Sequence, residues 1–244
     1  MLFNSFDFFV FLPLVYAGYW ILSKNTLRVQ NFFLLVASYV FYGWWDYRFL
    51  SLIFISTLVD YLVGLRIYNT SDRAAKRRWL WVSIGCNVGL LGFFKYYNFF
   101  VGSFTEAFTF FGYEIGNPWM LNIVLPVGIS FYTFQTMSYS LDIFKGRMQP
   151  TRNLVDFATY VSFFPQLVAG PIERASHLLP QLQHKRKCCY RQHAEGFRLI
   201  LWGLFKKVAI ADALAPMVDD IFSNAANYPS STLALGAIFF GFQI

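Results

Sequence analysis

The stretch that decides the fold reads LPVGISFYTFQ at residues 125–135, and it opens an apolar region that continues to Leu182. Prolines, glycines and the carboxylate of Asp142 interrupt this region, which also contains FFPQLVAGPIER at residues 163–174. Irregular backbone and polar side chains are tolerated at bilayer depth only where protein or a wet cavity surrounds them. The region therefore predicts a functional site inside a membrane rather than a wall that faces lipid.

The composition around this stretch is that of a membrane protein. Hydrophobic residues make up 57% of the 244 residues and charged residues only 14%, and the mean hydropathy is +0.44. An ordinary soluble domain carries more charge and fewer apolar residues. The apolar runs are continuous and lack the weak alternation of barrel strands. We therefore expect an all-α, polytopic membrane helical bundle, with the lipid bilayer as its first partner.

Eight apolar runs divide the chain, and several are shorter than the roughly 20 residues that cross a bilayer, so tilted or partial spans are expected. The runs are Phe6–Leu22, Phe32–Trp45, Phe49–Leu65, Trp79–Phe94, Met120–Phe144, Leu154–Ala169, Phe197–Met217 and Leu233–Ile244. The last run stops without a flanking anchor. We therefore expect that the sequence is truncated in its last helix and is a piece of a longer protein.

Lysine and arginine residues predict the orientation of the bundle. Basic clusters follow the first, third and fifth runs, whereas only Arg48 and Lys95 lie near the turns between them. Because basic loops stay in the cytoplasm, this alternation places the N-terminus outside. The basic residues behind the net charge of +7 are then explained by the orientation of the protein in the membrane, and no nucleic-acid partner is expected.

The run Leu154–Ala169 breaks this alternation, because a simple crossing would place the basic residues 174–191 outside. A re-entrant hairpin resolves the conflict. Its turn is expected near Phe164-Pro165-Gln166, since proline removes a backbone donor and disfavours helical geometry in the residue before it. Gly170-Pro171 then ends the returning arm.

Two segments of this region, LPVGISFYTFQ at 125–135 and FFPQLVAGPI at 163–172, resemble those of the membrane-bound O-acyltransferase family, in the branch that acetylates alginate. MLFNS at 1–5, YGWWD at 42–46 and FFKYY at 93–97 are similar to the same branch. The resemblance implies a ring of tilted helices around a thinned centre, where funnels from both faces meet at a catalytic histidine.

The reaction that this resemblance implies is acyl transfer across the bacterial inner membrane. A cytoplasmic thioester, acetyl-CoA or an acyl carrier, would be a co-substrate, and no bound cofactor is expected. The acyl group, expected to be acetyl, would reach hydroxyls of an extracytoplasmic polysaccharide such as alginate, with the help of periplasmic acetylation partner proteins. Two alternatives from other classes stay open: a polysaccharide or lipid transporter, and an inactive truncated scaffold.

None of the histidines of the sequence, His177, His184 and His193, matches the family's catalytic histidine, which is expected beyond Ile244. Residues 1–244 then form the N-terminal part of a single domain, and no catalytic residue is assigned within them. No metal site is expected either, because Cys188, Cys189 and the nearby histidines lack the ligand spacing of structural zinc sites.

The polar and turn residues of the two motifs are expected to line the substrate path. These are Ser130, Tyr132, Gln135, Tyr139, Pro165, Gln166, Gly170 and Pro171. Gln135 and Tyr139 are equally compatible with hydrogen bonding between helices. Glu173 and Arg174 are expected to mark the donor entrance, or else to form a surface pair. The basic residues 185–187 beside them would attract phosphates of a donor, and favour anionic lipid more strongly.

Overall fold

The computed structural model describes residues 3–110, 126, 128–167, 170, 171 and 173–243. Within these residues every regular element is a helix, as the sequence predicts. The chain divides into two compact units, which are described separately: Pro13–Arg186, and Lys187–Ile244 together with Leu2–Leu12.

Two helical stretches, Phe6–Lys24 and Leu27–Asn69, are long and apolar enough to cross a membrane. The first contains α1 (Phe6–Ile21) and one 3-10 turn. The second contains α2 (Leu27–Asp46) and α3 (Leu50–Asn69), joined by a 3-10 turn. At 1.5 Å per residue, a helix of 20 residues is about 30 Å long, which equals the hydrocarbon thickness of a bilayer. Helices α2 and α3 are longer than the runs Phe32–Trp45 and Phe49–Leu65 that predict them.

Helix α4 (Arg73–Leu91) begins at a strong cap. The carboxylate of Asp72 accepts hydrogen bonds from the backbone N–H groups of Ala74 and Ala75, and these bonds hold the pKa of Asp72 below its usual range. The run Trp79–Phe94 is expected to end at Phe94. Instead the helix continues through a π-helical turn at Gly92–Tyr96 into α5 (Tyr97–Phe110).

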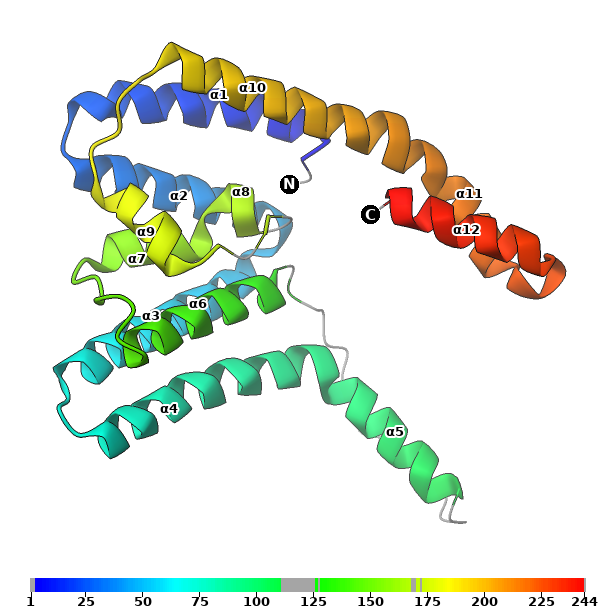
Figure 1. The fold of residues 1–244 in the computed structure, drawn as a ribbon, viewed down its shortest axis with the longest axis horizontal. Coiled ribbons are helices and arrows are strands. Elements are labelled where there is room, and N and C mark those ends of the chain that lie inside the picture. Colours follow the sequence, from blue (N-terminus) through cyan, green and yellow to red (C-terminus); the bar gives the residue numbers. More distant parts are fainter. Residues whose placement is uncertain (1–2, 111–125, 127, 168–169, 172, 244) are drawn as a thin grey trace. The chain divides into compact units, whose positions relative to one another are not determined.

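Helix α6 (Ile129–Phe144) packs against α3 and α4 and forms the centre of the first unit (Figure 1). The expected start of this run at Met120 lies outside the described residues. Close packing is possible because position 64 on α3 is glycine. A Cβ atom there would lie 2.7 Å from the ring of Tyr139, so the ring rests directly on the backbone of α3.

The chain reverses after α7 (Leu154–Ser162). Phe163 leaves helical geometry with ψ near 107°, α8 (Phe164–Leu167) adds one short turn, and α9 (Ala175–Gln183) packs back against α7. The break therefore lies at Phe163, just before the expected turn at Phe164-Pro165-Gln166, while Pro165 stands inside α8.

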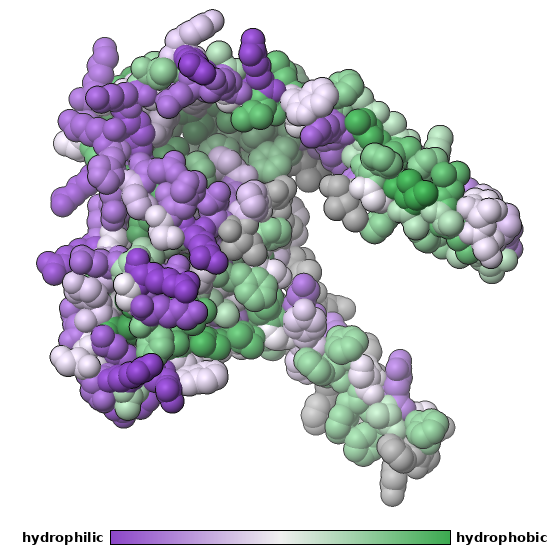
Figure 2. Space-filling model, in the orientation of Figure 1, coloured by the Kyte–Doolittle hydropathy of each residue, from purple (hydrophilic) through white to green (hydrophobic). Residues whose placement is uncertain are grey.

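The reversal gathers the basic loops of the first unit on one side. Arg186, which follows α9, lies 5.7 Å from the ring centroid of Tyr19 and donates to Gln30, next to the turn between α1 and α2. Tyr61 on α3 donates to the backbone carbonyl of Arg152, in the loop between α6 and α7. Figure 2 shows hydrophilic residues along this side of the first unit (left in the figure).

The second unit contains α10 (Tyr190–Phe205), a π-helical turn at Lys206–Ala211, α11 (Asp212–Ser223), a 3-10 turn at Ala225–Asn227 and α12 (Ser230–Gln243). Helices α11 and α12 pack together at Gly236, where a Cβ atom would lie 2.8 Å from Ile221. Lys207 forms an ion pair of 2.7 Å with Asp212, so this lysine in the apolar run Phe197–Met217 is neutralised locally.

Candidate functional site

The two central motifs meet directly in the first unit. Gly128, in the first motif, caps the N-terminus of α6 with φ at +77°, a left-handed conformation that favours glycine. A Cβ atom at this position would lie 2.5 Å from the carbonyl oxygen of Leu167 in the second motif. The sequence places these segments about forty residues apart, and glycine allows their backbones to touch.

A third element, α2, holds the turn of the second motif. The backbone N–H of Phe164 donates to the buried hydroxyl of Ser38 over 3.3 Å. The rings of Phe41 and Phe164 lie 5.4 Å apart between their centroids. Helix α8 is thus fixed on one side by α2 and on the other by the N-terminus of α6.

Gln166 lies at this junction with an amide that has no hydrogen-bond partner among the described residues. Its side chain is only 6% exposed, although both Nε2 and Oε1 are buried polar atoms. Such a group costs free energy unless it is bonded to water or to a ligand. Tyr132 and Thr133, one turn into α6, have buried hydroxyls in the same condition within the described part of the chain.

Gln135 and Tyr139 make contacts between helices. Gln135 donates from Nε2 to the backbone carbonyl of Tyr160 on α7 over 2.8 Å. The ring of Tyr139 packs at 4.4 Å from the centroid of Phe157 and covers Gly64. Gln135 therefore makes a hydrogen bond between helices, whereas Tyr139 contacts its neighbours by ring packing and its buried hydroxyl has no hydrogen-bond partner among the described residues.

The other residues that are expected to line the substrate path differ in how far they are exposed to solvent. Ser130 and Gly170 are half-buried, and Pro165 and Pro171 are exposed. Gly170 has no room for a side chain, since a Cβ atom there would lie 2.7 Å from the Cα of Gln166. Gly170 therefore holds the returning arm against the residue with the unpartnered amide.

Glu173 and Arg174 do not pair with each other in the described structure. The carboxylate of Glu173 lies 2.9 Å from Nδ1 of His177, and Arg174 is exposed at the N-cap of α9. Arg186 is half-buried and bonded to Gln30, which separates its role from that of its exposed neighbours Lys185 and Lys187. The basic stretch 185–187 thus contains one packing residue and two free for solvent contact.

The returning arm is joined to α7 by Tyr160, whose hydroxyl donates to the carbonyl of Glu173 over 3.2 Å. Tyr160 is fully buried, so Tyr160→Phe should lower the free energy of unfolding by about 1 kcal/mol, the net worth of one such bond. Thermal unfolding of the detergent-solubilised protein measures this change. Tyr190→Phe, at an exposed tyrosine, is the control and should match the wild type. Equal unfolding curves for all three proteins would show that the hydrogen bond from Tyr160 to Glu173 does not contribute to stability.

A buried polar cluster joins α3, α4 and α6, and sequence reasoning missed it. Asp60 is fully buried on α3. Its Oδ1 accepts from Ser140 on α6 over 2.9 Å and from Ser83 on α4, and its Oδ2 accepts from Nδ2 of Asn87 over 2.6 Å. Asn87 Oδ1 in turn accepts from Ser56 over 3.0 Å. The sequence does contain a signal for this cluster, because Asp60 is a carboxylate inside the apolar run Phe49–Leu65.

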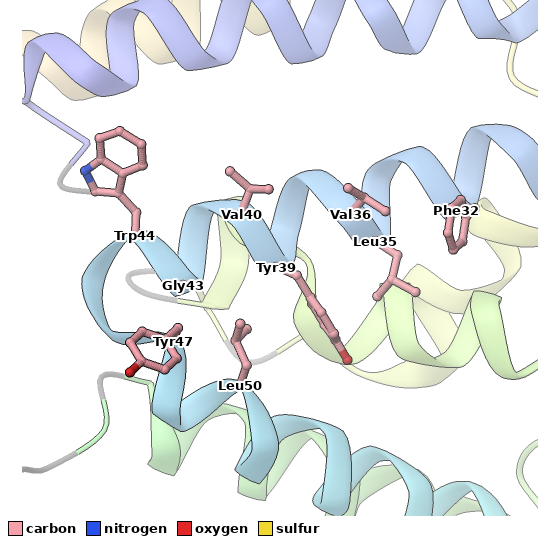
Figure 3. A pocket seen from close by; sticks show the side chains of 9 residues that line it. All are labelled: Phe32, Leu35, Val36, Tyr39, Val40, Gly43, Trp44, Tyr47 and Leu50. Atoms are coloured by element: carbon pink, nitrogen blue, oxygen red, sulfur yellow. The ribbon is translucent and has the colours of Figure 1, made fainter.

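An apolar groove lies along one face of α2 and is separate from these polar residues. Figure 3 shows its lining side chains, which recur at helical spacing from Phe32 to Tyr47 with Leu50 of α3 below them. Its volume is about 600 Å³. None of the expected path residues lines this groove.

Comparison with curated proteins finds relatives that are named as O-acetylating enzymes. The chain is 43% identical to the "probable alginate O-acetylase AlgI" of Azotobacter vinelandii, over 91% of this chain and 44% of the relative. It is 42% identical to the protein of the same name in Pseudomonas aeruginosa, over 100% of this chain and 46% of the relative. It is 35% identical to the peptidoglycan O-acetyltransferase of Helicobacter pylori, over 100% of this chain and 51% of the relative. The chain thus spans about half the length of these curated relatives. No family profile and no solved structure matches it.

Proposed function

The chain is a homologue of the alginate O-acetylases over its whole length, consistent with a fragment of a membrane-bound O-acyltransferase, and from this premise we propose that it forms the substrate path of such an enzyme. The complete protein transfers an acetyl group from a cytoplasmic thioester, acetyl-CoA or an acyl carrier, to an extracytoplasmic polysaccharide such as alginate. Similarity to proteins named as acetylases favours this function over the transporter alternative.

The proposed reaction is an ester exchange. A hydroxyl oxygen of the polysaccharide attacks the carbonyl carbon of the thioester, the C–S bond breaks, and a C–O ester bond forms. A general base takes the hydroxyl proton, and the thiol leaves with a proton. We propose that a histidine outside the 244 residues supplies this base, and that periplasmic partner proteins deliver the acceptor.

The proposed topology is a multi-pass protein of the bacterial inner membrane with its N-terminus outside. Two observations support it: the apolar stretches Phe6–Lys24 and Leu27–Asn69, and the gathering of basic loops on one side of the first unit. In this orientation α7, α8 and α9 form a re-entrant hairpin that enters from the cytoplasm. The turn at α8 then lies inside the membrane, where the acetyl group crosses.

The observation that carries the proposal is the buried amide of Gln166 at the junction of the two motifs, which has no hydrogen-bond partner in the part of the chain that the structure describes. An amide N–H group in this position is suited to donate to the carbonyl oxygen of an acyl group as negative charge develops on it. The hydroxyl of Tyr132 is a second donor of this kind within the described residues. Gln135 and Tyr139 hold α6 in place beside them.

Gln166→Ala in the complete protein should lower acetyl transfer by about a hundredfold or more, because one donor to the developing charge is lost. The O-acetyl content of alginate, made by a host that lacks its own acetylase, measures the effect, and the amount of protein in the membrane should stay the same. Gln149→Ala, at an exposed loop residue, is the control and should acetylate normally. Normal transfer by the Gln166 variant would remove this residue from the path. Acetylation of peptidoglycan but not of alginate would reassign the acceptor.

A further inference from the structure

A polar cavity of about 540 Å³ lies on the basic side of the first unit, apart from the proposed path. Its wall combines Arg28 at the start of α2, Tyr61 on α3, Arg152 in the loop before α7, and Asp156 in the first turn of α7. Two segments that are distant in sequence thus bring two guanidinium groups and one carboxylate to one opening, and a third adds the hydroxyl of Tyr61.

The charged side chains of the cavity do not neutralise each other. Neither Arg28 nor Arg152 forms an ion pair with any described residue, and both side chains are exposed. The backbone of Arg152 is fixed by the hydroxyl of Tyr61 over 2.7 Å. Asp156 is buried, and its Oδ1 accepts from Asn31 over 2.7 Å. The cavity therefore offers two cations and one anion to a ligand.

The position of the cavity points to a ligand at a membrane surface. Arg28 is the second residue of the apolar stretch Leu27–Asn69, which is long enough to cross a bilayer. A side chain at that point lies at the depth of lipid headgroups. Leu154, also in the cavity wall, is exposed and offers apolar contact beside the charges.

We propose that this cavity binds the phosphoethanolamine headgroup of a phospholipid, with the phosphate on Arg28 and Arg152 and the ammonium group facing Asp156. The planar guanidinium group of arginine can donate two hydrogen bonds to the oxygens of one phosphate. The carboxylate of Asp156 attracts the ammonium group, which makes the site selective for a zwitterionic headgroup over an anionic one. The proposal rests on the membrane placement given above and not on acetyl transfer. A cavity that binds a headgroup here would fix the α6–α7 loop at the membrane surface.

Lipid retention tests the proposal in the purified protein, taken from vesicles that contain phosphatidylethanolamine and phosphatidylglycerol in equal amounts. Native mass spectrometry should find phosphatidylethanolamine bound to the wild type. Arg152→Gln should reduce its retention by about tenfold, the value of one charge-assisted hydrogen bond. Asp156→Asn keeps an oxygen to accept from Asn31 and should shift retention toward phosphatidylglycerol. Arg77→Gln, at an exposed arginine outside the cavity, should leave retention unchanged.

Three results would overturn the proposal. Equal loss in Arg77→Gln and Arg152→Gln would show attraction to diffuse surface charge rather than a site. Full displacement of the lipid by soluble phosphoethanolamine or by inorganic phosphate would assign the cavity to a free phosphate ligand. Unchanged selectivity in Asp156→Asn would remove the ammonium contact. Because the readout is bound lipid, a protein without acetyl transfer would still give a decisive result.

Discussion

Gly128→Ala is expected to abolish the stable fold of the first unit. The new Cβ would lie 2.5 Å from the carbonyl oxygen of Leu167, and backbone atoms cannot rotate away as a side chain does. The left-handed conformation at φ +77° adds a strain of about 1–2 kcal/mol. The two motifs would separate, so the protein level in membranes and the thermal unfolding midpoint should both fall sharply.

Two further glycines separate the causes of this effect. Gly146 also has a positive φ, +71°, but a Cβ there would meet no atom within 4 Å, so Gly146→Ala measures the strain alone. Gly89, inside α4, has open space and helical geometry, and Gly89→Ala should be neutral or stabilising. Destabilisation of Gly128→Ala no larger than that of Gly146→Ala would show that the motifs do not touch.

Part of this structure follows from the sequence because apolar runs and charged loops are local signals. The helix over residues 27–46 contains its predicted run, and the helix over residues 50–69 contains all of its run except Phe49. Both helices add length at polar ends, which a hydropathy pattern undercounts. The charges of residues 174–191 predict a re-entrant hairpin, which stays a prediction, and the described chain shows a break in helical geometry after α7. Its break lies at Phe163 and not in the turn 164–166, because proline tolerates the first turn of a helix and here stands inside α8.

The contacts within the candidate site could not be predicted from local sequence patterns, because they join residues that are distant along the chain. The approach of Gly128 to Leu167 depends on how α6 packs, and no spacing rule relates the two positions. Gln166 was expected in the path, and the structure adds that its amide is buried without a partner among the described residues. Asp60 was missed because its partners lie 23 to 80 positions away along the chain.

Asp60→Ala is expected to destabilise the first unit by about 3 kcal/mol or more, since each hydrogen bond to a charged acceptor contributes about 1.5–3 kcal/mol. An ordinary hydrogen bond between membrane helices contributes only about 0.6 kcal/mol. Three donors on α4 and α6 converge on this one carboxylate, and the variant would remove the acceptor that they share, so that Asn87 keeps only its bond to the carbonyl of Ser83. Thermal unfolding in detergent measures the loss, and Asp219→Ala, at an exposed carboxylate on α11, is the matched control.

An exchange of the two central side chains makes this prediction specific. In Asp60→Asn, when the amide oxygen keeps the bonds from Ser83 and Ser140, the amide nitrogen faces the Nδ2 of Asn87, so two donors oppose each other. Adding Asn87→Asp returns an acceptor to that contact, and its carboxylate still accepts from Ser56 and Thr136. The double variant should therefore be more stable than Asp60→Asn, although the carbonyl of Ser83 loses its donor. Purely additive losses would mean that the two residues do not interact, because coupling between contacting side chains appears as non-additivity.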